Sequence, residues 1–309
     1  MKVGQNLGVG IIGLAFIAVP PGTPSSFPSG GAPTQMVVTA IPAPGNDAPV
    51  SLGADDVSVQ VGKLPAHILG SRRLSGDLAD TQLFVLLDDS TRSSSLSLQL
   101  RELKTFIESL PATTEVAVGY MRNGTASLAQ GFVMDHQKAA DSLRLPQAIP
   151  GENGSPYFAL SDLVKHWPSK ESAGRRVVLM ITDGVDRYFG SSLIDDPYVN
   201  QSISDALKHG VQVYSIYLRG AGLYGRGDWT MNVAQSRLSQ VSEETGGFAY
   251  FLGFTDPVSV APFLSDFQSR LDHRYVLTIQ ANERGLQPVQ VRSELRNLKI
   301  VGPTRVYLQ

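Results

Sequence analysis

The sequence predicts an α/β protein in which a doubly wound, mainly parallel sheet is inserted into a small β domain built from both ends of the chain. The first observation is that short apolar runs alternate, between about Thr81 and Leu271, with segments whose apolar residues recur at helical spacing. Repeated strand–helix units of this kind build a parallel sheet with helices on both faces. The second observation is that the pattern is purely β before Thr81 and after Arg274. Because neither flank could form a stable sheet alone, we expect the two to pair.

The central block begins with Leu83–Leu87, a continuous apolar run of the kind that is buried on both faces of a parallel sheet. Val177–Thr182 is a second such run, and Leu128–Met134 is expected to be an edge strand. The other expected strands of the block are Val116–Met121, Val211–Leu218 and Phe248–Leu252. Helical spacing predicts helices at Leu96–Ile107, Phe158–Trp167, Val199–Lys208, Val233–Glu244 and Val258–Leu271. The flanks carry short β signals at Gln35–Ile41, Val57–Val61, Leu64–Leu69, Tyr275–Gln280, Pro288–Glu294 and Arg305–Leu308.

The N-terminus has the pattern of an export signal. Lys2 precedes the uncharged apolar stretch Leu7–Val19, which is shorter than the roughly 20 residues that a membrane span requires. A cleaved signal peptide and a retained anchor are both compatible with this pattern. The following residues are rich in Pro, Gly and Ser and predict a flexible spacer. We therefore divide the chain into a signal or anchor (1–19), a spacer (20–34), an N-terminal β segment (35–80), an α/β domain (81–273) and a C-terminal β segment (274–309).

Composition excludes several classes of function. The chain has 309 residues, no Cys and a formal net charge of −2. The absence of Cys removes disulfides, thiol nucleophiles and thiolate metal sites. A nucleic-acid-binding protein needs clustered Lys and Arg to neutralise phosphates, and the sequence has no such cluster. The five His residues show no metal-ligand spacing, which argues against a zinc site.

Polar side chains follow two of the buried strands and precede one helix. Asp88 and Ser90 follow the first buried strand, Asp183 follows another, and Ser155 lies directly before a helix. In an open α/β sheet such loops emerge at the carboxyl edge, where ligands bind. Carboxylate and hydroxyl oxygens suit a hard cation such as Mg²⁺ or Mn²⁺. The same residue types also serve as ordinary helix caps and turn residues, so each motif alone is weak.

Taken in order, these motifs resemble the von Willebrand factor A domain, a Rossmann-like binding module. The resemblance covers roughly Thr81 to Leu271, with a D-x-S-x-S-like loop, a Gly-Ser loop and a Thr-Asp-Gly loop. The flanks resemble those of bacterial secreted proteins that contain such a domain. The resemblance implies a metal-ion-dependent adhesion site, in which Asp88, Ser90, Ser155 and Asp183 would hold Mg²⁺ or Mn²⁺. An acidic group of a protein ligand would complete the coordination.

The sequence departs from the family pattern at two positions of this site, and at one of them Ser155 stands where the family has Thr. With Asp88 as the first acid, Arg92 stands where the second hydroxyl is expected, and a guanidinium has no lone pair for a metal. An alternative register with Asp89, Thr91 and Ser93 restores both hydroxyls. A second interpretation keeps Asp88 and lets Arg92 replace the metal. In that case Arg92 would pair with Asp88 or Asp183, or would bind the ligand carboxylate as a bidentate partner.

Two loops on the same edge are candidates for ligand binding. Tyr188 follows the Thr-Asp-Gly loop, and Asp228 follows the next strand. Long loops on a rigid scaffold often carry recognition, although Gly and Tyr also simply fill irregular loops. The tripeptide Arg226-Gly227-Asp228 matches an integrin-binding sequence, but so short a match recurs by chance.

Three hypotheses for the function follow. The first is an exported protein-binding or adhesion module that uses a divalent cation and no small-molecule cofactor, and the second is a metal-free interaction scaffold of a cell-envelope complex. The third is an enzyme of the haloacid dehalogenase phosphatase type, which also begins with a strand followed by D-x-D. Ser90 stands at the second acidic position of that motif, which removes the general acid/base that the chemistry requires. The sequence therefore favours binding in the cell envelope or outside the cell over catalysis.

Overall fold

The computed structural model describes residues 31–43, 51–75, 79–91, 93–149, 154–170, 175–189, 195–219 and 227–309. Residues 31–309 form one compact unit. The expected signal or anchor at 1–19 and most of the expected spacer at 20–34 lie outside the described residues. None of the helices described is both long and apolar enough to cross a membrane.

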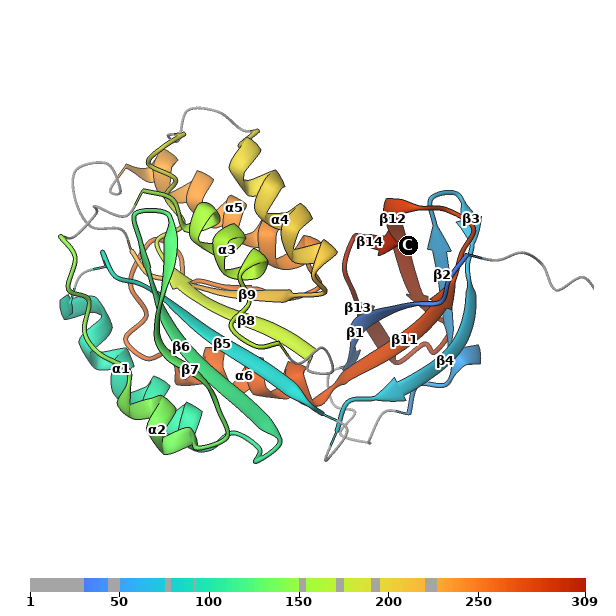
Figure 1. The fold of residues 1–309 in the computed structure, drawn as a ribbon, viewed down its shortest axis with the longest axis horizontal. Helices are drawn as coiled ribbons and strands as arrows, with labels where there is room; N and C mark the ends of the chain where they lie inside the picture. Colours follow the sequence, from blue (N-terminus) through green and yellow to red (C-terminus); the bar gives the residue numbers. More distant parts are fainter. Residues whose placement is uncertain are drawn as a thin grey trace, which may run out of the picture. The chain divides into compact units, whose positions relative to one another are not determined.

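A six-stranded sheet forms the centre of the α/β part (Figure 1). The strand order is β10-β9-β8-β5-β6-β7, and only the edge strand β7 is antiparallel to its neighbour. All eight residues of β5 are buried, which confirms the expected central strand. The strands are β5 (Thr81–Asp88), β6 (Thr114–Arg122), β7 (Thr125–Val133), β8 (Arg175–Thr182), β9 (Gln212–Tyr217) and β10 (Ala249–Tyr250).

Helices cover both faces of this sheet (Figure 1). Alternate side chains of β5 explain the two layers, because Leu83 and Leu87 enter one hydrophobic core whereas Phe84 and Leu86 enter the other. The first core is completed by α1 (Ser93–Glu108), α2 (His136–Asp141) and α6 (Ala261–Asp272). The second core is completed by α3 (Pro156–Lys165), α4 (Pro197–Lys208) and α5 (Asp228–Glu244). The expected doubly wound α/β architecture is confirmed.

The two flanks pair with each other in antiparallel sheets, as the sequence predicts. One sheet has the order β13-β1-β11-β4 and the other has the order β14-β12-β2-β3, so each mixes strands from both ends of the chain. A third hydrophobic core fills this β part. The N-terminal elements are β1 (Thr34–Pro42), a short 3-10 helix (Ala54–Asp56), β2 (Val57–Val61), β3 (Leu64–Pro65) and β4 (His67–Arg73). The C-terminal strands are β11 (Arg274–Gln280), β12 (Gly285–Ser293), β13 (Leu298–Val301) and β14 (Arg305–Leu308).

Arg274 connects the β part to the base of the six-stranded sheet. It is 1% exposed, although it lies two residues after the end of α6 and begins β11. One guanidinium nitrogen donates to the hydroxyl of Thr81 at 2.6 Å, and Nε donates to the carbonyl of Leu271 at 3.2 Å. Burial lowers the pKa of Arg274 to about 10. The start of β5 and the start of β11 are therefore held together by a buried cation.

The structure differs from the predicted elements mainly in short or capped segments. Helix α2 has six residues and β13 has four, and neither is long enough to show a periodic pattern. Helix α5 begins at Asp228, five residues before the expected start, because Gly227 caps it and its first turn is largely polar and exposed. Strand β10 is limited to two residues of the expected Phe248–Leu252 run.

Candidate functional site at the carboxyl edge of the sheet

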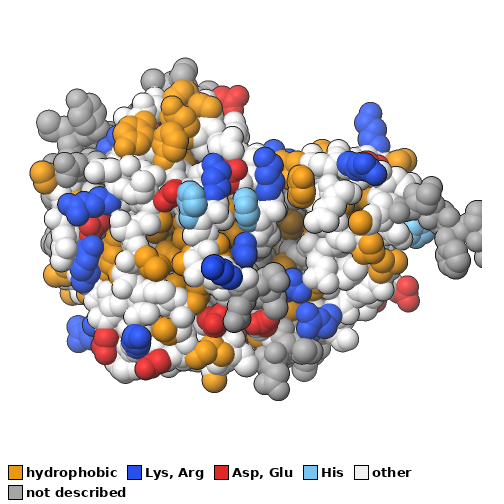
Figure 2. Space-filling view, in the orientation of Figure 1, with side chains coloured by type: hydrophobic (Ala, Val, Ile, Leu, Met, Phe, Trp, Pro, Cys, Tyr) orange, Lys and Arg blue, Asp and Glu red, His pale blue; other side chains and the backbone are white. Residues whose placement is uncertain are grey.

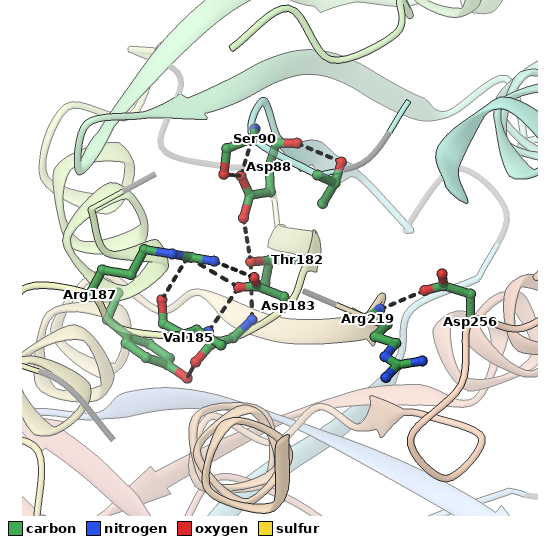
Figure 3. A network of polar contacts seen from close by, with 11 residues as sticks. Asp88, Ser90, Thr182, Asp183, Val185, Arg187, Arg219 and Asp256 are labelled. Carbon is green, nitrogen blue, oxygen red and sulfur yellow. Dashed lines mark hydrogen bonds and ion pairs between the residues drawn. The ribbon is translucent and has the colours of Figure 1, made fainter. Parts of the chain in front are cut away.

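Asp88 ends β5 at the carboxyl edge of the six-stranded sheet and accepts hydrogen bonds from two directions (Figure 3). The amide and the hydroxyl of Ser90 donate to its Oδ1 at 2.9 and 2.8 Å. The hydroxyl of Thr182, at the end of the neighbouring strand β8, donates to its Oδ2 at 2.9 Å. Asp88 and Ser90 are therefore together, as predicted, and the carboxylate is directed toward β8.

Asp183 follows Thr182 and forms an ion pair with Arg187 (Figure 3). The distance from Nη2 of Arg187 to Oδ2 of Asp183 is 2.6 Å, and Nη1 lies 3.5 Å from Oδ1. The side chains are 14% and 4% exposed, respectively. Oδ1 of Asp183 also accepts the amide of Val185 at 2.9 Å, and Nη1 of Arg187 donates to the carbonyl of Val185 at 3.3 Å. Both oxygens of Asp183 thus already have donors.

Ser155 contacts a third carboxylate rather than Asp88 or Asp183. Its hydroxyl donates to Oδ2 of Asp186 at 2.7 Å and also caps α3 by accepting the amide of Phe158. Oδ1 of Asp186 accepts the amides of Tyr188 and Phe189, both at 2.9 Å. Ser155 therefore holds the loop after β8 against the start of α3.

Three buried carboxylates surround the guanidinium of Arg187. Asp88, Asp183 and Asp186 are each at most 3% exposed, and all three interact electrostatically with Arg187. Burial raises the pKa of Asp88, and the charge of Asp183 raises it further, while the bonds from Ser90 and the charge of Arg187 lower it. The cluster thus contains more acidic groups than cations, and Arg187 reduces the cost of burying them.

The residues of the alternative register are directed elsewhere. The carboxylate of Asp89 pairs with Arg144 at 2.6 Å and accepts the amide of Gln147 at 3.0 Å. The hydroxyl of Thr91 donates to the backbone carbonyl of Asp88. Ser93 begins α1, and its side chain lies outside the described residues. Of the two adjacent acids, Asp88 is the one that reaches Thr182.

The structure places the three candidate ligand-binding residues in different positions relative to the site or leaves them outside the described residues. Arg92 lies outside the described residues. Tyr188 is 56% exposed, and its ring packs edge-on against Phe158 beside the carboxylate cluster, with a centroid distance of 5.6 Å. Asp228 is exposed in the first turn of α5, where its carbonyl accepts the side-chain amide of Asn232. Tyr188 is therefore the candidate that the structure places beside the predicted site.

The donor set of this edge does not fit a divalent cation as it stands. A metal between Asp88 and Asp183 needs free carboxylate oxygens, whereas Arg187 already binds Asp183 with a positive charge. Ser155, the expected hydroxyl ligand, is bonded to Asp186. Within the described ranges, no group of three or more His, Asp or Glu side chains is arranged to hold a metal ion. The cation site at Asp88, Ser90, Ser155 and Asp183 stays a prediction that would require Arg187 to move.

Sequence reasoning missed three residues that build the cluster. Thr182, Asp186 and Arg187 all lie within six residues of the sequence, in and after the Thr-Asp-Gly loop. Asp186 and Arg187 do not stand at metal-ligand positions of the family pattern, so the resemblance did not point to them. A usable signal was present, since Asp183 and Arg187 have the i, i+4 spacing of an ion pair.

Comparisons with known proteins give similarities at low identity. An aerotolerance-related membrane protein from Bacteroides fragilis, with multiple mutations to serines, is 14% identical, with a TM-score of 0.44 over 62% of this chain and 98% of the other. The conserved hypothetical protein BatB from Bacteroides thetaiotaomicron is 15% identical, with a TM-score of 0.44 over 62% and 98%. Proximal thread matrix protein 1 from the mussel byssus is 16% identical, with a TM-score of 0.45 over 69% and 50%. No protein-family model and no curated protein matches the chain. A family assignment therefore depends on the motifs and the site.

Proposed function

We propose that the chain is an exported interaction module of the von Willebrand factor A type, which binds a protein partner at the carboxyl edge of its six-stranded sheet. We further propose that Arg187 provides the positive charge of this edge, so that binding does not require a divalent cation. The proposal combines the motif order of the sequence with the ion pair between Arg187 and Asp183.

The observation that carries the binding proposal is the exposure of large apolar side chains on the loops of this edge. Such side chains are 41% to 86% exposed and lie in segments that follow parallel strands or precede helices, or, for Trp229, in the first turn of α5. They are Leu145, Ile149, Tyr188, Trp229, Leu252 and Val258. Single exposed apolar residues are common, but several on the loops of one edge are typical of a recognition surface. Figure 2 also shows hydrophobic side chains gathered near the top of the α/β part.

The metal-free form of the proposal is supported by the environment of Arg187. A metal would recruit an acidic group of the partner, whereas Arg187 is already bonded to Asp183. An acidic group of the partner would therefore have to compete with Asp183 for the guanidinium. We expect apolar contacts to provide most of the affinity, as is usual at the centre of protein interfaces.

The polar partners of the cluster support binding rather than catalysis. Asp88 and Asp183 accept bonds from hydroxyls, backbone amides and a guanidinium, none of which exchanges a proton readily near neutral pH. We accordingly propose no enzymatic activity.

The proposal of export has its own test. A full-length protein that stays unprocessed in the soluble cytoplasmic fraction would contradict it.

Site-specific photocrosslinking tests the binding surface. A photoreactive amino acid is placed at Ile149 or Trp229, and as matched controls at Leu64 or Leu69, which are exposed to a similar degree in the β part. We expect both edge positions to crosslink to one shared partner in cells of the source organism, in the presence and absence of EDTA. Crosslinks of equal yield from the control positions would contradict the proposed surface, and loss with EDTA would favour the cation-dependent form.

A further inference from the structure

A second candidate site lies at the opposite edge of the six-stranded sheet, where β8 and β9 begin. A cavity of about 550 Å³ is lined there by the starts of these strands, the end of α4, and parts of β1 and β14. Among the described residues that line it, none is Asp or Glu. The basic residues of the lining are Arg175, Arg176, Lys208, His209 and Arg305. We call this cavity the basic cleft.

The concentration of basic residues is local. The whole chain has 28 Asp and Glu residues and 26 Lys and Arg residues, so an average surface would mix the two signs. Figure 2 shows Lys, Arg and His side chains around the hollowed centre of the face that it draws, with some Asp or Glu side chains beside them. A concave surface lined by one sign of charge concentrates ligands of the opposite sign.

Within the part of the chain that the structure describes, the side chains of the two arginines at the start of β8 contact neutral groups. Nη2 of Arg175 donates to the side-chain carbonyl of Gln35 at 2.9 Å. The guanidinium of Arg176 lies over the ring of Trp167, 5.5 Å from its centroid. Burial lowers the pKa of both arginines, and the charge of Arg72 lowers that of Arg175 further, against the opposing effect of Asp80. An anion in the cleft would therefore offset part of the cost of burying these two charges.

The other basic residues differ in whether they are free to bind an anion. Lys208 and His209 are exposed at the end of α4, and Nδ1 of His209 is bonded to the carbonyl of Asp205 at 2.8 Å. Arg305 pairs with Glu244 at 2.9 Å, so its charge is already balanced. The binding charge of the cleft thus comes mainly from Arg175, Arg176 and Lys208.

We propose that the basic cleft binds a small multivalent anion through phosphate or carboxylate groups. A guanidinium that lines the cleft matches the paired oxygens of a phosphate or a carboxylate, and Lys208 adds a further positive charge. This site is separate from the proposed protein-binding surface, since the two lie at opposite ends of the same parallel strands. Either proposal can therefore fail without the other.

Calorimetric titration of the full chain tests this site. The probes are pyrophosphate for the phosphate class and citrate for the carboxylate class, with sodium chloride at matched ionic strength as the control. We expect one molecule of at least one probe to bind per chain and to raise the melting temperature, whereas chloride does neither. Binding of only one probe identifies the class of the anion, and binding of both assigns the shared oxyanion chemistry.

Substitutions locate the bound probe. Arg176→Gln and Lys208→Gln should each weaken it, and the double variant should weaken it at least tenfold. Lys138→Gln, which removes an exposed lysine of α2, should leave affinity unchanged. Arg176 also contacts Trp167, so Arg176→Gln could fail to fold. Lys208 is exposed, and Lys208→Gln therefore tests the site independently of that contact. The proposal would be overturned if chloride and the probes had equal effects on the heat of binding and the melting temperature. It would also be overturned if Lys208→Gln and the double variant left probe binding unchanged.

Discussion

Nη2 of Arg187 lies 2.6 Å from Oδ2 of Asp183, at the edge where the sequence predicts a divalent cation. The pair joins the Thr-Asp-Gly loop to the turn that follows it, and the amide of Arg187 is also bonded to the carbonyl of Gly154 at 2.7 Å. One arginine therefore neutralises a buried acid and positions the loop before α3.

Loss of Arg187 should destabilise the protein strongly. Arg187→Gln leaves Asp183 buried without its ion-pair partner, and removal of one member of a buried pair typically costs about 3–5 kcal/mol. Arg270→Gln is the matched control, because Arg270 pairs with Asp266 at the same i, i+4 spacing and the same 2.6 Å, but Asp266 is 48% exposed. We expect the control to cost less than Arg187→Gln, because the carboxylate of Asp266 remains in contact with solvent. The measurement is the free energy of unfolding in denaturant, and equal losses in the two variants would contradict a structural role of the buried pair.

The stability deficit of Arg187→Gln should depend on pH. Burial and Asp183 raise the pKa of Asp88, and Arg187 opposes this effect, so its removal raises that pKa further. A carboxyl whose pKa is higher in the folded state binds protons preferentially when folded. Stability therefore rises as pH falls through the folded pKa toward the unfolded value of about 4. We expect the deficit relative to the wild type to shrink between pH 8 and pH 5, and a deficit that grows over this range would contradict the charge argument.

Removal of the guanidinium should also make the edge responsive to metal. In Arg187→Ala, Oδ2 of Asp183 loses its guanidinium donor, and carboxylate and hydroxyl oxygens are suitable ligands for Mn²⁺. We expect Mn²⁺ to raise the melting temperature of Arg187→Ala and to leave that of the wild type unchanged. An equally large Mn²⁺-induced rise in the wild type would show that the cation binds with Arg187 in place or displaces it.

The alternation of strands and helices was sufficient to predict the sheet because long buried elements impose a pattern on the sequence. β5 and β8 are continuous apolar runs, and the faces of α3 and α4 follow helical spacing. The pairing of the flanks was also predictable, since neither could bury its apolar residues alone. Element ends were less certain, because caps such as Gly227 act through backbone geometry that apolar spacing does not record.

Only part of the candidate site was predicted from the sequence, because the pairing of its side chains depends on tertiary structure. The sequence placed Asp88, Ser90 and Asp183 at one edge, but it could not show which donor each carboxylate accepts. Arg187 enters the site through a turn, and its direction depends on the bond between its amide and Gly154. Ser155 was expected on the cation and instead bonds to Asp186. Tertiary packing, rather than residue type, determines which hydrogen-bond partner each of these side chains has.

Gly247 should not tolerate a side chain. A Cβ at this position would lie 2.0 Å from the backbone carbonyl oxygen of Val213 in β9, which cannot move without disturbing the sheet. We expect Gly247→Ala to lower the free energy of unfolding by about 1–3 kcal/mol, the usual range for overpacking. Gly70→Ala is the control, because no atom lies within 4 Å of the added Cβ. The comparison requires thermal melting of both variants, and a neutral Gly247→Ala would show that β9 and the following segment are loosely packed.

Removal of the C-terminal β segment should unfold the whole β part rather than trim it. β11 lies between β1 and β4, and β12 lies between β14 and β2, so a chain that ends at Arg274 loses the central strand of both sheets. Met36 and Val38 of β1 and Val57 and Val59 of β2, which are each at most 5% exposed, would then face solvent beside unpaired strand edges. Exposed apolar edges of this kind promote aggregation. We expect the truncated chain to elute as aggregates in size-exclusion chromatography and to melt at a lower temperature. A soluble monomer with unchanged melting would mean that the N-terminal strands are stable without their partners.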